Sequence, residues 1–130
     1  MSVAGTYVLT SNENYLEWLT ALGVPAERVT RMVAVKPKVV VSVTGSEVVV
    51  KTEAGDKSFT NTINLGKDSK AELPGGIEYV VNLSLSGSKL EGTWNLGDKS
   101  GTALVEFTAS GATQTVVLGD ITAKRVYSRQ

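Results

Sequence analysis

The chain has 130 residues, the size of one domain, and its 13 basic and 13 acidic residues give no net charge. It contains neither cysteine nor histidine, which excludes disulfides, cysteine-based zinc sites and histidine-dependent catalysis. An enzyme would have to work through Glu, Asp, Lys, Ser or Tyr. The balanced charge argues against nucleic-acid binding, which usually needs a basic surplus. We therefore expect a single domain over residues 1–130, with no metal ion and no cofactor.

The first ten residues and the hydropathy of the whole chain bear on its location. MSVAGTYVLT has no basic region and no long apolar run, so we expect no signal peptide. No apolar stretch reaches the about 18 residues that a membrane-spanning helix needs. We expect a cytosolic protein.

A strand opens the chain and a helical segment follows it. GTYVLTS (residues 5–11) has the valine and threonine content of a β-strand. Residues 11–37 instead show helical spacing, with apolar residues at intervals of three and four. This apolar stripe consists of Tyr15, Trp18, Leu19 and Leu22. Ser11 or Asn12 is expected as the N-cap of the first helix.

A second helix is expected after a short break. Gly23 suits the left-handed position that ends a helix, and Pro25 suits the first position of the next one. The second helix has a weaker apolar face, formed by Val29, Met32 and Val33. Pro37 then favours a return to extended structure.

The rest of the sequence predicts short strands separated by turns. Gly45 permits the positive φ of a tight hairpin, and Gly55-Asp56 and Pro74-Gly75-Gly76 are further turn signals. The expected strands cover residues 39–45, 47–55, 57–66, 69–73, 77–87, 89–97, 100–111, 112–119 and 121–129.

About ten short strands at regular spacing predict an up-and-down antiparallel β-barrel, or β-clam, with a helix-turn-helix between its first and second strands. Such a barrel is too wide for its own side chains to fill. Residues 112–119, with Gln114 among them, and residues 82–88 place polar side chains where a dry core would need aliphatic ones. We therefore expect a cavity, partly lined by Gln114, with the helices as a lid over one open end. That design suits a container for a small, largely apolar molecule.

Four stretches match one family in order and spacing. GTYVLTSNENYLEWLTALGV (5–24) contains a Gly-Thr-aromatic strand, a helix start and a Leu-Gly-Val between helices. KPKVVVSVTGSEVVVKTEA (36–54) matches the hairpin that follows, and FTNT (59–62) matches a Phe-x-Asn-Thr piece. LGDITAKRVYSR (118–129) matches a closing strand with an Arg-x-Tyr pair. In these stretches the chain resembles the intracellular lipid-binding proteins, which include the fatty-acid-binding and cellular retinoid-binding proteins.

The resemblance implies roles for several residues. Arg125 and Tyr127 would point into the cavity and hold the carboxylate of a ligand. A guanidinium matches a carboxylate with a planar fork, and a phenol adds one donor. Phe59 would lie beside the entrance, and Met32 and Val33 would line it.

The second arginine that the resemblance implies is missing from GTALVEFT (101–108). Counting along the chain places its position at Leu104 or Glu106. If Glu106 faces the cavity, it would pair with Arg125 and favour a less acidic ligand, such as a retinoid alcohol, an acyl ester or a pigment. If Leu104 takes the position, Arg125 and Tyr127 alone would hold a carboxylate.

The resemblance implies a monomeric carrier that binds one or two long-chain fatty acids, or a similar hydrophobe, and performs no chemistry. A basic patch near the lid would contact anionic membranes during ligand delivery, and it consists of Arg28, Arg31, Lys36 and Lys38. Three alternatives stay open: a carrier of a retinoid, bile acid, bilin or carotenoid, an enzyme or light-emitting protein that uses the cavity, and a β-rich interaction module.

Overall fold

The computed structural model describes residues 3–55, 57–73 and 77–130. The turn predicted at Pro74-Gly75-Gly76 lies outside these residues, as does Asp56. In chain order, the elements are β1 (Gly5–Glu13), α1 (Tyr15–Leu22), α2 (Ala26–Ala34), β2 (Lys38–Thr44), β3 (Glu47–Ala54), β4 (Lys57–Asn64), β5 (Asp68–Leu73), β6 (Ile77–Ser86), β7 (Lys89–Leu96), β8 (Lys99–Phe107), β9 (Gly111–Leu118) and β10 (Ile121–Arg129).

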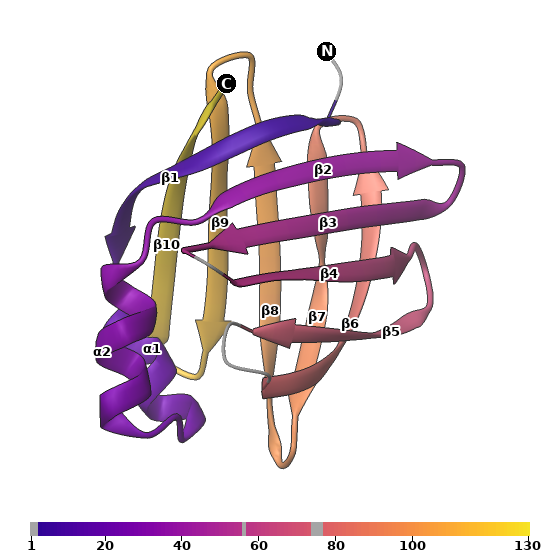
Figure 1. The fold of residues 1–130 in the computed structure, drawn as a ribbon. Coiled ribbons are helices and arrows are strands. Elements are labelled where there is room, and N and C mark those ends of the chain that lie inside the picture. The colour runs from indigo at the N-terminus through magenta and orange to yellow at the C-terminus, as the bar shows by residue number, and fades with distance from the viewer. Residues whose placement is uncertain (1–2, 56, 74–76) are drawn as a thin grey trace.

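The ten strands form one antiparallel sheet in the order β4-β3-β2-β1-β10-β9-β8-β7-β6-β5. Strands adjacent in sequence pair with each other, and β1 also pairs with β10. The exception is β4 and β5, the two edge strands of the sheet, which are joined by side-chain hydrogen bonds. The sheet thus curls into a nearly closed barrel. Figure 1 shows β1–β5 running across β6–β10, with α1 and α2 side by side at one end. The predicted up-and-down barrel with a helical pair after its first strand is confirmed.

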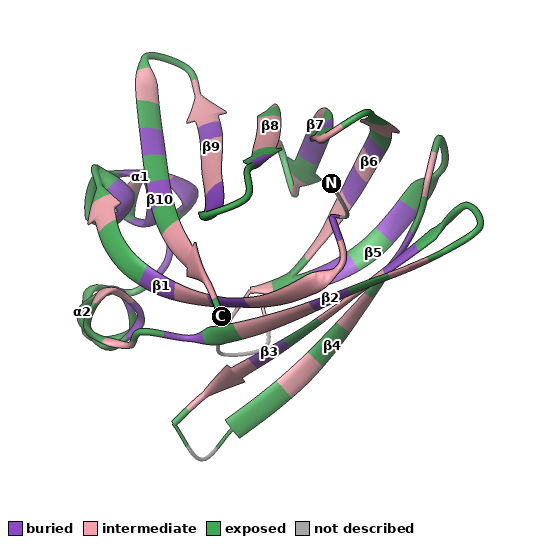
Figure 2. Ribbon diagram, turned by 90° about the horizontal axis from the view of Figure 1, so that it is seen from above, coloured by how far each residue is buried: buried purple, intermediate pink, exposed green. Residues whose placement is uncertain are grey.

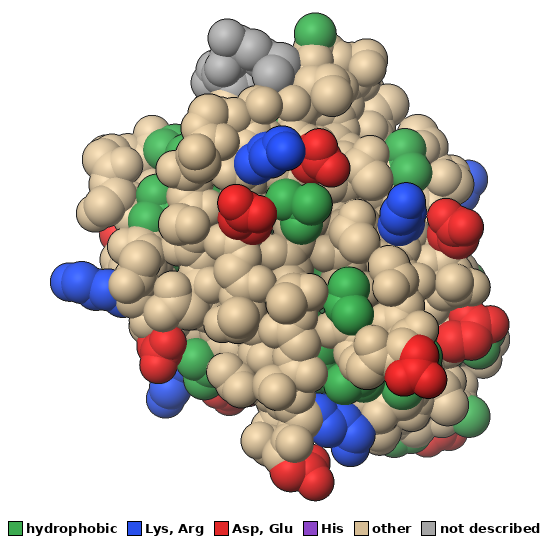
Figure 3. All heavy atoms as spheres, turned by 180° about the vertical axis from the view of Figure 1, so that it is seen from behind, with side chains coloured by type: hydrophobic (Ala, Val, Ile, Leu, Met, Phe, Trp, Pro, Cys, Tyr) green, Lys and Arg blue, Asp and Glu red, His purple; other side chains and the backbone are tan. Residues whose placement is uncertain are grey.

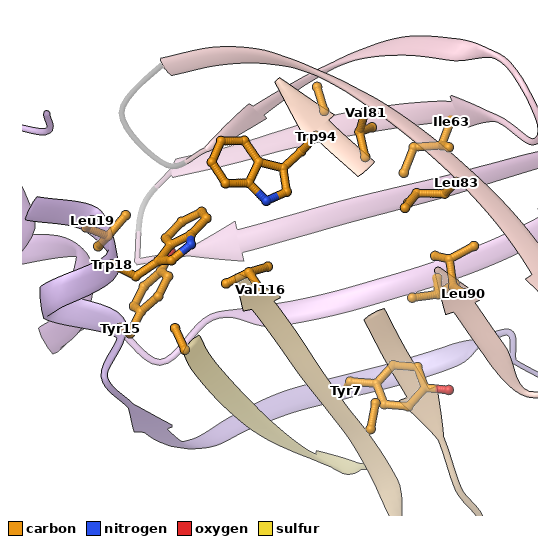
Figure 4. Close-up of a cluster of buried hydrophobic side chains, with 14 of the residues drawn as sticks. Tyr7, Tyr15, Trp18, Leu19, Ile63, Val81, Leu83, Leu90, Trp94 and Val116 are labelled. Carbon is orange, nitrogen blue, oxygen red and sulfur yellow. The ribbon is translucent and has the colours of Figure 1, made fainter. Parts of the chain in front are cut away.

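Side chains alternate between the interior and the surface along most strands, as the bands of colour in Figure 2 show. In β3, for example, Val48 and Thr52 are buried whereas Lys51 is exposed. Buried aromatic and aliphatic side chains from α1 and from both halves of the barrel form one core cluster (Figure 4). Every second residue of a strand therefore faces the interior, so the inward residues of one strand are all even-numbered or all odd-numbered where the strand is regular.

The junction between β1 and α1 differs from the sequence prediction. Ser11 and Asn12 do not cap α1, because β1 continues through Glu13 in register with β10. Asn14 occupies the N-cap position with a φ of 58°. Its side-chain Nδ2–H donates to the main-chain oxygen of Thr122 at 3.2 Å. The strand pairing outcompetes the predicted cap, since each strand residue gains ladder hydrogen bonds that a cap would forfeit.

The helices end and begin close to the predicted glycine and proline. Gly23, at a φ of 95°, ends α1, and its N–H bonds to the carbonyl of Thr20 at 3.0 Å. Pro25 is the N-cap of α2 rather than its first helical residue. Neither of the helices in the described residues has the length and apolarity needed to cross a bilayer.

Charges of both signs are interspersed on the face opposite to that of Figure 1, where apolar side chains are scattered (Figure 3). This pattern agrees with the zero net charge of the sequence. Leu16 and Val126 are the exposed large hydrophobic residues in the described part of the chain. Scattered apolar residues of this kind are normal on a protein surface.

Candidate ligand-binding site

The barrel encloses a cavity of about 200 Å³. A single water needs only about 10–15 Å³ of such space, so the cavity has room for a larger guest. Most of the lining is aliphatic or aromatic and includes Val41, Ile63, Leu83, Leu90, Trp94 and Val116. Figure 4 shows Ile63, Leu83, Leu90, Trp94 and Val116 arriving from different strands around a shared interior. The greater part of the cavity therefore favours an apolar ligand.

Arg125 places a guanidinium in this apolar lining. It lies in β10 between Ala123 and Tyr127, and the alternation of the strand turns all three toward the interior. Its exposed fraction is 8%. Its Nε–H donates to Oδ1 of Asn12 at 3.0 Å, and Nη1 donates to the hydroxyl oxygen of Tyr15 at 3.3 Å. The site thus contains a buried cation at the lid end of the barrel.

No carboxylate in the described residues forms an ion pair with Arg125. Its charge is instead covered by aromatic rings, with Cζ at 4.1 Å from the ring centroid of Tyr15 and 5.8 Å from that of Tyr127. Cation–π contacts and neutral hydrogen bonds stabilise a buried cation without cancelling it. A buried charge without a group of opposite charge is unfavourable, so the site suits an anionic group brought by a ligand.

Tyr15, Tyr79 and Tyr127 line the same cavity. The rings of Tyr15 and Tyr127 lie near the guanidinium of Arg125. Burial raises the pKa of Tyr79 to about 12, and the neighbouring phenols of Tyr15 and Tyr127 add to the effect. Burial also raises the pKa of Tyr15 and of Tyr127, although the charge of Arg125 acts in the opposite direction. All three are neutral phenols at neutral pH, and therefore donors for an anion.

The whole sequence matches one known protein family. The model of the lipocalin / cytosolic fatty-acid binding protein family matches residues 1–130. The chain belongs to this family.

Individual members cover nearly the whole chain. A fatty acid-binding protein of Tyrophagus putrescentiae is 30% identical over 97% of this chain and 96% of its own length. Fatty acid binding protein 1-B.1 of Danio rerio is 28% identical over 99% of this chain and 98% of its own. The solved structure of a Schistosoma mansoni fatty acid binding protein in complex with arachidonic acid superimposes with a TM-score of 0.91 and 25% identity, covering 100% of this chain and 98% of that one. The family fold therefore extends from end to end.

Four of the residues singled out from the sequence line the cavity: Arg125, Tyr127, Phe59 and Gln114. Gln114 of β9 lies directly opposite Arg125 of β10 in the sheet. Residues directly opposite each other share a face of the sheet. The structure therefore places Gln114 beside Arg125 on the cavity face of the sheet, whereas Phe59 approaches the cavity from β4.

Neither residue proposed for the missing arginine position faces the cavity. The register pairs Gln114 with Val105, and Val105 lines the cavity, whereas Leu104 and Glu106 have the opposite parity on β8. Glu106 is exposed on the outer surface. A difference of one residue along a strand reverses the face of the sheet, so counting along the chain alone does not identify the inward residue. Glu106 therefore does not face the cavity and does not pair with Arg125, and the inward-facing residue between the two candidates is Val105.

The second helix contributes Met32 and Val33 to the core. Met32 is buried in the core cluster at 7% exposure, and Val33 packs against that cluster. Neither is among the residues that line the cavity. They therefore pack α2 against the core, and their expected place at the entrance stays a prediction.

Three residues of the site are not predicted from the sequence. Tyr79 shares its parity on β6 with Val81 and Leu83, and all three line the cavity, so alternation within 77–87 could have identified it. Tyr15 was assigned only to the packing stripe of α1. Asn12 was assigned to a helix cap, and no sequence signal placed it beside Arg125.

Proposed function

We propose that this protein is an intracellular carrier that binds a long-chain fatty acid, or a similar hydrophobic carboxylate, inside the barrel. The observation that carries the proposal is Arg125, a buried guanidinium that lies in an apolar cavity and has no acidic partner in the described residues. A ligand carboxylate would supply the missing charge through charge-assisted hydrogen bonds. The names of the related proteins, and the arachidonic acid in the Schistosoma mansoni structure, support this ligand class.

The aliphatic lining would supply most of the affinity. Burial of each methylene group of the ligand contributes about 0.8 kcal/mol before the losses of association. The head group would meet Arg125 and the hydroxyl of Tyr127, while the tail follows the lining formed by side chains such as Leu83 and Leu90. In this arrangement the head group of the ligand determines its orientation in the cavity, and the apolar tail determines most of the binding affinity.

The proposal extends to how the carrier works. Residues 1–130 act as a single monomeric domain in the cytoplasm and perform no chemistry on the ligand. The basic side chains Arg28, Arg31, Lys36 and Lys38 are exposed on and beside α2. They would attract the helical lid to an anionic membrane during ligand transfer. If so, a higher salt concentration screens this attraction and slows ligand transfer to anionic vesicles.

Titration of delipidated protein with oleic acid and with methyl oleate tests the proposal. We expect Arg125→Ala to weaken oleate binding by about 1.5–3 kcal/mol, the range of hydrogen bonds to charged groups, and to leave methyl oleate nearly unchanged. Equal losses for the acid and the ester would contradict a head-group role for Arg125.

Organic extraction of the purified protein followed by mass spectrometry separates this ligand class from the alternatives. Co-purified fatty acid supports the proposal. A retinoid, bile acid, bilin or carotenoid in the extract would assign a different cargo. Conversion of an added ligand into a new product would indicate an enzyme, and failure to bind any of these molecules would leave an interaction module.

A further inference from the structure

A β-bulge decides which residue of β1 faces Arg125. Leu9 pairs with Tyr127, but the register then shifts, so that Ser11 pairs with Val126 and Asn12 pairs with Arg125. In a regular ladder, Ser11 would have stood opposite Arg125. The hydroxyl of Thr10, at the bulge, donates to the main-chain oxygen of Val126 at 2.9 Å and fastens the irregularity. Bulges often re-aim a side chain next to a functional site.

The re-aimed side chain holds the guanidinium in one orientation. Oδ1 of Asn12 accepts the Nε–H of Arg125 at 3.0 Å. The face of the guanidinium lies on the ring of Tyr15, whose hydroxyl accepts from Nη1. These contacts engage Nε and Nη1, whereas Nη2 makes no hydrogen bond within the described residues, so its N–H donors stay available to a ligand. A planar fork with a fixed orientation is suited to a carboxylate.

The chemistry of the holding group also matters. An amide oxygen satisfies a buried N–H donor without adding charge, whereas a carboxylate at the same place would form an ion pair with Arg125. The adjacent carboxylate of Glu13 is exposed and stands opposite Lys124 in the ladder. The local structure therefore places a neutral acceptor, and no acid, beside the buried cation.

We propose that Asn12 is a positioning and specificity-determining residue of the head-group site: it orients Arg125 toward the cavity and leaves the positive charge uncancelled for an anionic ligand. This inference rests on the proposed function. It assigns preference for carboxylates over neutral lipids to a pair of residues, Arg125 and Asn12, rather than to Arg125 alone.

The test compares wild-type protein with Asn12→Asp and with the control Asn95→Asp, which adds the same charge at an exposed position of β7. Dissociation constants for oleic acid and methyl oleate are measured for each, together with thermal stability. We expect Asn12→Asp to lower the affinity for oleate about tenfold or more, which is a change of about 1.4 kcal/mol, and to leave methyl oleate within about twofold. Asn95→Asp should change neither.

Asn12→Ala removes the acceptor without adding charge and should lower the ratio of acid to ester affinity by about threefold, an intermediate loss. If Asn12→Asp does not fold, this variant decides the question. A ratio unchanged in the folded Asn12 variants would overturn the inference, even where Arg125→Ala still weakens oleate. Wild-type protein that binds no oleate would instead refute the proposed function itself.

Discussion

The side-chain amide of Asn61 in β4 forms two hydrogen bonds with the main chain of Glu72 in β5. Its Nδ2–H donates to the carbonyl of Glu72 at 3.1 Å, and its Oδ1 accepts the N–H of Glu72 at 2.9 Å. The amide thus imitates one peptide unit of a neighbouring strand at the place where the two edges of the sheet meet. Asn61 and Glu72 also line the cavity, so this contact closes part of its wall.

Replacing Asn61 should weaken the contact between the edge strands β4 and β5. Asn61→Ala removes both hydrogen bonds, and we expect a loss of about 1 kcal/mol in the free energy of unfolding, since both bonds are solvent-exposed. The more specific effect is faster amide exchange at Glu72. Urea unfolding and hydrogen exchange measure the two quantities. Asn64→Ala, at an exposed position of the same strand, is the control, and equal exchange at Glu72 in both variants would contradict the assignment.

The ring of Tyr15 should matter more than its hydroxyl. Tyr15→Phe keeps the ring that covers Arg125 and loses only the long contact to Nη1, so we expect a change below about 1 kcal/mol. Tyr15→Leu removes the cation–π contact and the stacking on Trp18, and should destabilise the fold by about 2 kcal/mol or more. Urea unfolding followed by tryptophan fluorescence compares the two. Equal losses would show that the hydroxyl, rather than the ring, supports Arg125.

Stability should fall steeply in alkaline solution. The pKa of Tyr79 rises from 10 to about 12 on folding, so between these pH values the unfolded chain loses a proton that the folded protein keeps. The unfolded state then binds fewer protons, and the free energy of unfolding decreases by about 1.4 kcal/mol per pH unit for each such phenol. Tyr79→Phe should reduce the slope of the free energy of unfolding against pH by the contribution of one phenol. Urea unfolding across this range, paired with tyrosinate absorbance, measures it, and an unaltered slope would place the perturbed phenol elsewhere.

The strands and the lid were predictable because their signals are local. Turn glycines such as Gly45, at a φ of 58°, separate segments with strand composition, and the stripe of α1 has unmistakable helical spacing. Arg125 and Tyr127 could be assigned to one face because β10 alternates cleanly. The same reasoning would have added Tyr79 in β6.

The remaining parts of the site depend on pairing between distant strands. In β8, the consecutive apolar residues Ala103, Leu104 and Val105 give no alternation, so only the register with β9 shows that Val105 faces inward. The position of Asn12 depends on the bulge at Thr10, which is visible only in the pairing with β10. A shift of one residue exchanges the two faces, and sequence spacing alone does not reveal it.

The inward position of Val105 gives a way to test the corrected register. Val105→Arg would add a second guanidinium to the cavity, on the strand beyond Gln114 as seen from Arg125. Two buried cations without an acid repel each other and are poorly solvated, so the empty protein should lose about 3 kcal/mol or more in the free energy of unfolding. Oleate would pair with both charges, and should therefore raise the melting temperature of this variant more than that of the wild type.

Leu104→Arg is the matched control for this substitution, because it places the same side chain one residue earlier on the outer face of β8. There the guanidinium stays in water, and we expect a change in stability within about 0.5 kcal/mol and an unaltered response to oleate. Calorimetric melting of both variants, with and without oleate, makes the comparison. If Leu104→Arg proved the more destabilised and the more oleate-responsive of the two, β8 would have the opposite parity, and the cavity position would return to an even-numbered residue.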